Sequence, residues 1–361
     1  MDVHLDGLFS QNVSYDYDQD YLYEEDVELK TSKVVLIPLL YSLELVIGLL
    51  GNGLLLAVLA QKIRSWTITD TFVLHQCVAD VLLLLTLPLW AAQAAQQRGW
   101  CFGAFLCKIN GAVFNINFFC GIFLLVCISL DRYLSIAHTT QLYSKKKPRL
   151  AHISCLSVWI VSIFLTFPDC FFLEARVDLA LDKTLCFHSY SQPVTNWQLA
   201  SRLLHHTLGF LLPSAALIIC CSCILQRLQR SSSISPKKQW AIMIMLPLVV
   251  VFLLCWMPYN ITLIVDTFKS SSKELERSLK KALSITSGLG CMHACLRPLL
   301  YLGLCANFRK RTLAMLRCDK VESESWLWEL DVGEEDLSDQ NHEVEELNQR
   351  TSVDPVQSTE C

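Results

Sequence analysis

The chain has 361 residues, of which 53% are hydrophobic and 18% are charged, and its mean hydropathy is +0.38. A soluble domain of this length is less apolar and more highly charged, so the composition excludes an ordinary soluble protein. The formal net charge of −4 is uninformative because acidic and basic residues lie in separate segments.

The amino-terminal residues 1–33 are acidic and lack an apolar period, so we predict a disordered segment. Four of its tyrosines lie among carboxylates and are candidates for sulfation: Tyr15, Tyr17, Tyr21 and Tyr23. One interpretation is a solubilising tail, and the other is a docking segment for a basic partner. The sequon Asn12-Val13-Ser14 predicts glycosylation of Asn12 if this end is extracellular.

Seven apolar segments that are long enough to span a bilayer follow. They cover residues 34–61, 70–96, 104–138, 150–173, 197–228, 238–268 and 279–304. Basic residues gather in three loops on one side, at 62–64, 145–149 and 227–238. The positive-inside rule places these loops in the cytoplasm and the amino terminus outside. The basic loop before the seventh span is an exception to this pattern.

The third span runs from Cys107 to Arg132 and carries no charge between Lys108 and Asp131. As a helix it is roughly 38 Å long, slightly more than the roughly 30 Å of a bilayer's hydrocarbon core. It therefore presents Cys107 on one side of the membrane and Asp131-Arg132-Tyr133 on the other. We interpret this span as sensing an external event near Cys107 and reporting it near Arg132.

The segment after the seventh span, residues 305–318, places Phe308, Met315 and Leu316 on one helical face. Basic residues surround that face, which predicts a short amphipathic eighth helix on the inner membrane surface. Cys318 is a candidate for palmitoylation. Residues 319–361 are acidic and contain several serines and threonines, so we predict a disordered cytoplasmic tail that is open to kinases.

Several polar side chains lie where hydrocarbon is expected: Asn52, Asp80, Asn115, Asn117, His293 and Arg297. Hydrogen bonds between helices are a sufficient explanation for Asn115 and Asn117. Asp80 and Arg297 need more, because each is a buried charge that requires a partner. Prolines within the spans predict kinks, which let one half of a helix move against the other.

An ordered set of motifs carries a resemblance to a known family. The set is Gly51-Asn52, Ala79-Asp80, Asp131-Arg132-Tyr133, Trp159, Pro213, Cys255-Trp256-Met257-Pro258 and Pro298-Leu299-Leu300-Tyr301. Over about residues 30–318 the chain resembles the rhodopsin-family G-protein-coupled receptors, which implies an all-α membrane protein with a seven-transmembrane helix bundle over residues 34–304. Thr86-Leu87-Pro88, Trp100-Cys101-Phe102-Gly103 and the acidic amino terminus resemble the CXC chemokine receptors, and Phe114–Phe118 and Thr286–Gly290 narrow this resemblance to one type.

The resemblance implies a disulfide between Cys107 and Cys186, and an amino terminus that holds the folded core of a basic CXC chemokine. The flexible end of the chemokine then enters a pocket whose candidate residues are Trp90, Phe114, Asp169, Asp266 and Ser287. The two carboxylates are the expected contacts for its cationic groups. An activation switch is implied at Asp80, Asp131, Arg132, Tyr133, Trp256, Pro258, Arg297, Pro298 and Tyr301. In it, Arg132 is restrained by Asp131 at rest and freed for a heterotrimeric G protein.

The chain also departs from that family. The second disulfide typical of chemokine receptors is missing, because no cysteine precedes Cys77 and none lies between Cys255 and Cys291. Cys221 replaces a usual tyrosine, and Arg297-Pro298 replaces Asn-Pro. The resemblance places Arg297 close to Asp80, where such receptors often hold a sodium ion, and we expect an ion pair of the two to replace that ion.

Two functions fit these observations. The first is a plasma-membrane receptor that couples to inhibitory G proteins and drives leukocyte chemotaxis, with arrestin and receptor kinases acting on its tail. The second is a scavenging receptor that internalises chemokine without G-protein output. A transporter or channel needs internal repeats or a polar pathway, and neither is evident. No enzyme motif, cofactor, metal site or nucleic-acid partner is expected, and His205 and His206 are expected to point apart on a helix.

Overall fold

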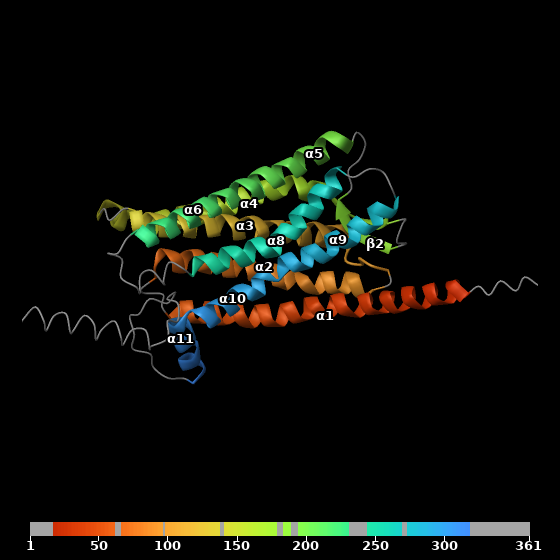
Figure 1. Ribbon diagram of the computed structural model, residues 1–361, viewed down its shortest axis with the longest axis horizontal. Helices are drawn as coiled ribbons and strands as arrows, with labels where there is room; N and C mark the ends of the chain where they lie inside the picture. The colour runs from red at the N-terminus through yellow and green to blue at the C-terminus, as the bar shows by residue number, and fades with distance from the viewer. Residues whose placement is uncertain are drawn as a thin grey trace, which may run out of the picture.

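The computed structural model describes residues 17–61, 66–96, 98–137, 141–178, 183–188, 194–230, 244–268 and 273–317. Long helices lie side by side along one direction and form a bundle (Figure 1). The first four are α1 (Tyr17–Gln61), α2 (Ile68–Ala95), α3 (Gly103–Ala137) and α4 (Gln141–Phe172). A hairpin of β1 (Leu173–Asp178) and β2 (Lys183–His188) follows.

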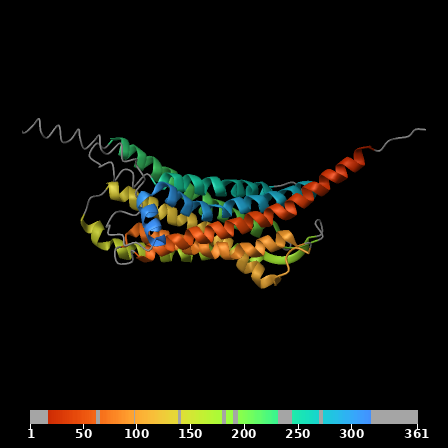
Figure 2. The same ribbon diagram turned by 90° about the horizontal axis from the view of Figure 1, so that it is seen from below.

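The second half of the bundle contains one continuous helical rod and three further helices. The rod is α5 (Val194–Leu204), the π-helix η2 (His205–Leu211) and α6 (Leu212–Arg230). It is followed by α8 (Met245–Phe268), α9 (Lys273–Cys291) and α10 (His293–Leu304). The last helix, α11 (Ala306–Leu316), turns away from the bundle axis (Figure 2). Within the bundle, α3 packs against α2, α4, α6 and α8.

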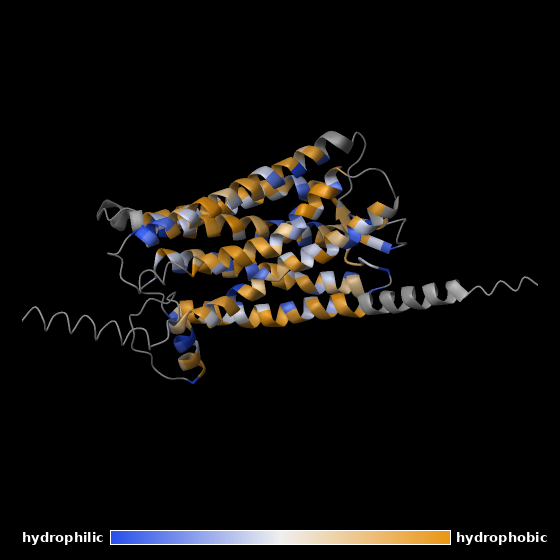
Figure 3. Ribbon diagram, in the orientation of Figure 1, coloured by the Kyte–Doolittle hydropathy of each residue, from blue (hydrophilic) through white to orange (hydrophobic). Residues whose placement is uncertain are grey.

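The bundle is apolar along most of its length, with polar residues concentrated toward the helix ends (Figure 3). Large apolar side chains point outward, including Leu43 at 53% exposed, Phe164 at 72% and Leu254 at 62%. Such an exposed apolar surface suits hydrocarbon rather than water. Six helices are long and apolar enough to cross a membrane, and their bounds agree within a few residues with six of the predicted spans where the chain is described.

The seventh predicted span, residues 279–304, is divided into α9 and α10 by a break at Met292. The amide of Met292 donates to the carbonyls of both Gly288 and Leu289, at 3.2 and 3.3 Å. One turn further on, Pro298 has no N–H to donate to the carbonyl of Ala294. The Asn52 side chain of α1 donates to that carbonyl instead, at 2.9 Å. The divided helix is therefore tied directly to α1.

The hairpin is an addition to the predicted all-α fold. Its strands pair antiparallel, from Leu173 opposite His188 to Asp178 opposite Lys183. The disulfide predicted between Cys107 and Cys186 is present and joins β2 to α3. The amide of Trp100 donates to the carbonyl of Thr184 at 2.6 Å, so the segment before α3 also holds the hairpin.

The structure near the amino-terminal end of the chain differs from the prediction. Helix α1 begins at Tyr17, so residues 17–33 are helical rather than disordered. This stretch contains no glycine or proline, and a helix that is already nucleated by an apolar span extends without a new nucleation cost. At the other end, α11 falls within the predicted 305–318 and buries Phe308 against Tyr301. The tail 319–361 lies outside the described residues.

Candidate functional site

Aromatic side chains from three helices meet in the half of the bundle nearest the hairpin. The ring of Phe114 on α3 lies 6.4 Å from Trp90 on α2, between ring centroids. It also lies 5.3 Å from Trp256 and 5.4 Å from Tyr259, both on α8. The structure therefore brings the predicted residues Trp90, Phe114 and Trp256 together in one cluster. Tyr259 joins them, although the sequence analysis did not select it.

Asp169, predicted as a contact for a cationic ligand group, is engaged by other side chains of the bundle. Asn115 of α3 donates to one of its oxygens at 3.2 Å, and Ser201 of α5 donates to the other at 2.6 Å. The imidazole of His205 lies 4.0 Å away. Only 5% of Asp169 is exposed. Its carboxylate thus holds α3, α4 and α5 together.

Asp266, the second predicted carboxylate, lies opposite a cation. Its Oδ2 is 3.9 Å from Nη2 of Arg202, and both side chains are largely buried. This pair joins α5 to α8 near the hairpin end. Ser287, also predicted to contact ligand, donates to the carbonyl of Ser284 on its own helix at 2.9 Å. The predicted contact of Asp266 with a ligand cation therefore requires that cation to compete with Arg202.

Both histidines of the η2 segment face the interior, which contradicts the expectation that His205 and His206 point apart. They are 3% and 7% exposed, and their rings lie 5.5 Å apart. The cause is the π-helix, in which the amide of Leu212 donates five residues back to Thr207. The wider turn changes the directions in which successive side chains point. His205 stacks on Phe118 at 5.1 Å.

A buried ion pair occupies the centre of the bundle. Nη1 of Arg297 on α10 lies 2.6 Å from Oδ2 of Asp80 on α2, as the sequence predicts. Asn117 of α3 donates to the other carboxylate oxygen at 3.0 Å. Asp80 is 1% exposed and Arg297 is 4% exposed. The pairing explains how two opposite charges are tolerated at membrane depth.

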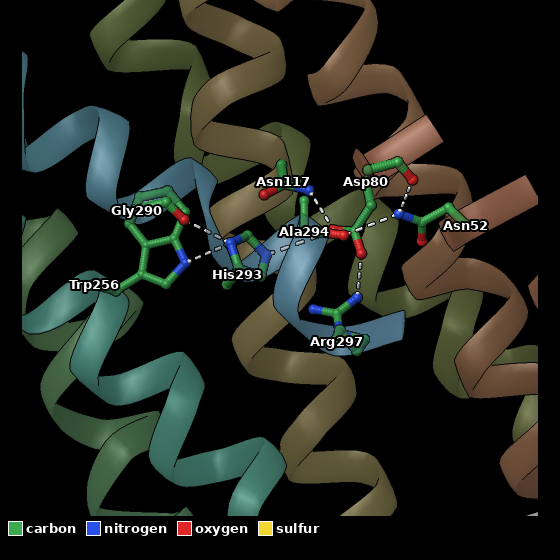
Figure 4. A network of polar contacts seen from close by, with 9 residues as sticks. Asn52, Asp80, Asn117, Trp256, Gly290, His293, Ala294 and Arg297 are labelled. Carbon is green, nitrogen blue, oxygen red and sulfur yellow. Dashed lines mark hydrogen bonds and ion pairs between the residues drawn. The ribbon is translucent and has the colours of Figure 1, made fainter. Parts of the chain in front are cut away.

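His293 connects this ion pair to the aromatic cluster (Figure 4). Its Nε2 lies 3.5 Å from Asp80, while its Nδ1 lies 3.2 Å from Nε1 of Trp256 and 2.6 Å from the carbonyl of Gly290. A single Nδ1 cannot accept from the indole and donate to the carbonyl at once, so the tautomer of His293 selects one of them. The sequence marked His293 as an unexpected polar residue in a span but did not assign this role.

Arg132 is buried at the opposite end of α3, where 7% of it is exposed. Its guanidinium donates a hydrogen bond to the hydroxyl of Thr69 on α2. The carboxylates of Asp131 and Asp70 lie close enough to stabilise its positive charge. The arginine is therefore restrained by α2 as well as by the neighbouring Asp131.

The other predicted site residues lie on helices or outside the described part of the chain. Tyr17, Tyr21 and Tyr23 fall on the first turns of α1. Tyr15, the glycosylation candidate Asn12 and the palmitoylation candidate Cys318 lie outside the described residues. Tyr133 continues α3 beside Arg132, and Pro258 and Pro298 lie within α8 and α10. Within the described part of the chain, no group of three or more His, Cys, Asp or Glu side chains is arranged to hold a metal ion.

Comparison with known proteins adds independent information. The family described as 7 transmembrane receptor (rhodopsin family) matches residues 51–301. C-X-C chemokine receptor type 3 of Bos taurus is 41% identical over 319 residues, covering 85% of each chain. The Homo sapiens protein of the same name is 42% identical over 297 residues, 81% of this chain and 78% of that one. C-X-C chemokine receptor type 1 of Oryctolagus cuniculus is 33% identical over 307 residues, 83% of this chain and 84% of that one.

Proposed function

Because the chain belongs to the rhodopsin family of seven-transmembrane receptors, and within it to the chemokine receptors, we propose that it is a plasma-membrane receptor for CXC chemokines. In this proposal it activates inhibitory heterotrimeric G proteins and promotes leukocyte chemotaxis. One observation carries the proposal: polar and aromatic contacts run without interruption from Trp90 to Arg297, and Arg132 is in place beyond them.

Ligand binding begins at the acidic amino terminus, which attracts the basic core of the chemokine. The flexible end of the chemokine then reaches the aromatic cluster of Trp90, Phe114, Trp256 and Tyr259, where rings offer apolar and cation–π contacts. The ligand shifts the receptor only to the extent that it binds the active arrangement more tightly than the resting one.

Displacement of Trp256 transmits the signal inward, because the indole contacts His293 and His293 contacts Asp80. The kink at Pro258 lets the remainder of α8 swing without breaking its helical bonds. Movement of α8 exposes the end of α3, and Arg132 leaves Thr69 to meet the G protein. Kinases and arrestin then act on the tail.

A scavenging receptor is the second candidate, and the Asp80–Arg297 ion pair favours it. A fixed ion pair at 2.6 Å in the centre of the bundle stiffens the contact between α2 and α10. If that contact must rearrange during activation, the pair opposes G-protein output while leaving chemokine binding and uptake intact. The two candidates therefore differ in output and share the ligand class.

The experiment that separates them records G-protein activation and ligand uptake together in cells expressing the receptor, against a panel of CXC chemokines. Activation that is lost in Arg132→Ala, at equal surface expression and with uptake retained, establishes the signalling receptor. Uptake without activation in the wild type establishes the scavenging receptor. Absence of both responses rejects the ligand class.

A further inference from the structure

Glu44 is an acidic residue in the middle of the first span, and neither the sequence motifs nor the proposed mechanism uses it. It lies on α1 three residues after Tyr41 and four before Gly48, so the three share one helical face. That face is turned into the bundle: Tyr41 is 6% exposed, and a Cβ added to Gly48 would lie 2.5 Å from Leu84 of α2. Glu44 therefore points between helices rather than toward lipid.

Among the residues that the structure describes, no basic side chain forms an ion pair with the carboxylate of Glu44. Its main-chain carbonyl accepts a hydrogen bond from the thiol of Cys295 at 3.0 Å. The titratable groups near it in the described part of the chain include a phenol and three thiols, which are neutral at physiological pH: Tyr41, Cys255, Cys291 and Cys295. Its Oε2 is buried, and no side chain that the structure describes donates a hydrogen bond to it.

This situation differs from that of the two carboxylates predicted to meet the ligand. Asp169 already accepts from Asn115 and Ser201, and Asp266 faces Arg202. Glu44 thus has the capacity to accept a donor that these two have already used. An ionisable side chain at membrane depth that lacks a partner in the protein is costly, and such residues usually serve a ligand or an ion.

Glu44 lies where α1 contacts both halves of the divided seventh span. The hydroxyl of Tyr41 lies 3.4 Å from the Cβ position of Gly288, so the turn above Glu44 contacts α9 next to the predicted ligand residue Ser287. Below it, Cys291 and Cys295 flank the break at Met292. A charge bound at Glu44 therefore acts on α1 and on both halves of the divided seventh span.

We propose that Glu44 binds a cationic group at the tip of the chemokine's flexible segment, its terminal ammonium, in the seam between α1, α9 and α10. The inference rests on the proposed function and adds the residue that neutralises this charge. Ammonium binding satisfies Oε2 by a charge-assisted hydrogen bond and removes the unpaired buried carboxylate. Asp169 and Asp266 then serve mainly to organise the helices around the ligand.

A ligand–receptor double-mutant cycle tests the proposal. The activating chemokine is prepared with a free amino terminus and in a desamino form that lacks only the ammonium. Each is assayed on wild type, Glu44→Gln, Asp169→Asn and Asp266→Asn at equal surface expression. We expect loss of the ammonium to lower potency on wild type by about tenfold or more, the size of a charge-assisted hydrogen bond. On Glu44→Gln the two ligands should be equipotent, while both aspartate variants keep the difference.

The conservative variant Glu44→Asp guards against a general packing defect. It keeps the charge on a shorter side chain, so part of the preference for the free ammonium should return. The assignment is overturned if Glu44→Gln keeps the full difference in potency between the two ligands. It is also overturned if Asp169→Asn or Asp266→Asn, rather than Glu44→Gln, abolishes that difference. If wild type neither responds to nor takes up any CXC chemokine, the proposed receptor function is wrong. That outcome differs from a receptor that responds to chemokine but shows no energetic coupling between Glu44 and the ligand's ammonium.

Discussion

Arg297 places a tethered positive charge beside Asp80, and this has a consequence for ions in solution. Its Nη1 is 2.6 Å from Oδ2, and the other oxygen accepts from Asn117. A cation attracted to Asp80 must displace a guanidinium that cannot diffuse away. The carboxylate is therefore already neutralised by the chain itself.

The first prediction concerns sodium. Ligand affinity of the wild type should be unchanged when sodium is replaced by a bulky organic cation at constant ionic strength, because Arg297 occupies the carboxylate. Arg297→Asn frees Asp80, and ligand affinity should then depend on sodium. Radioligand or fluorescent-chemokine binding in the two media measures the effect. An Arg297→Asn receptor that remains insensitive would contradict the role of Arg297 as a replacement cation.

Removal of the other partner should be more damaging. Asp80→Asn leaves the Arg297 guanidinium buried without a counter-charge, and breaking a buried pair in this way costs about 3–5 kcal/mol. We expect a large loss of surface expression and of thermal stability in detergent. The double variant Asp80→Asn with Arg297→Gln removes both charges and should recover most of the loss. A double variant as unstable as Asp80→Asn alone would show that charge pairing is not what Arg297 contributes.

At the scale of elements, the hairpin depends on a close approach of two backbones. Gly99 has φ of +74° and pairs with Thr184 of β2, and an added Cβ would lie 2.2 Å from the carbonyl oxygen of Thr184. Gly103 has a similar φ of +78°, but nothing lies within 4 Å of its Cβ position. The two glycines therefore differ in contact and not in backbone conformation.

This difference yields a matched pair of variants. Gly103→Ala adds only the strain of a positive φ, about 1–2 kcal/mol. Gly99→Ala adds the same strain and also pushes β2 away from the residues before α3. We expect Gly99→Ala to weaken chemokine binding clearly more than Gly103→Ala at matched surface expression. Equal effects of the two substitutions would mean that the contact between β2 and the backbone at Gly99 does not contribute to chemokine binding.

Some features of the helices are predictable from the sequence, and others are not. Apolar length reveals spans whatever their packing, and the family resemblance together with charge balance predicts the ion pair of Asp80 and Arg297. The inward direction of both His205 and His206 is not predictable in this way, because it depends on a local change from α- to π-helical hydrogen bonding. The division at Met292 is equally hidden, since the apolar pattern continues across it.

The candidate site also contains features that the sequence predicts and features that it does not. The family resemblance selects Trp90, Phe114 and Trp256, and these do form a cluster. It also selects Asp169 and Asp266 as contacts for the ligand's cationic groups, but it does not reveal that neighbouring helices supply partners to both carboxylates. Partners contributed by distant segments are a property of packing, which a linear pattern does not contain.

At the scale of the whole molecule, α3 is held by contacts toward both of its ends. Near the hairpin, Phe114 and Phe118 contact Trp256, at 5.3 and 4.7 Å between ring centroids. At the far end, Arg132 donates to Thr69. In the proposed mechanism, activation requires release of the second contact, whatever ligand acts on the first.

Thr69→Val tests this requirement without touching α3. Valine keeps the shape of threonine but removes the hydroxyl, so the Arg132 guanidinium loses an acceptor in the resting arrangement only. A lost hydrogen bond to a charged group is worth about 1.5–3 kcal/mol, which shifts the balance toward the active state by roughly tenfold or more. We expect higher G-protein activation in the absence of ligand, measured at equal surface expression.

Thr71→Val supplies the control, because the hydroxyl of Thr71 is also buried but bonds within its own helix, to the carbonyl of Thr67. It should leave ligand-independent activation near the wild-type value. Arg132→Ala combined with Thr69→Val should be silent, since the freed arginine is what the G protein meets. Unchanged basal activity in Thr69→Val, in a receptor that responds to chemokine, would mean that the contact between α2 and α3 does not restrain Arg132.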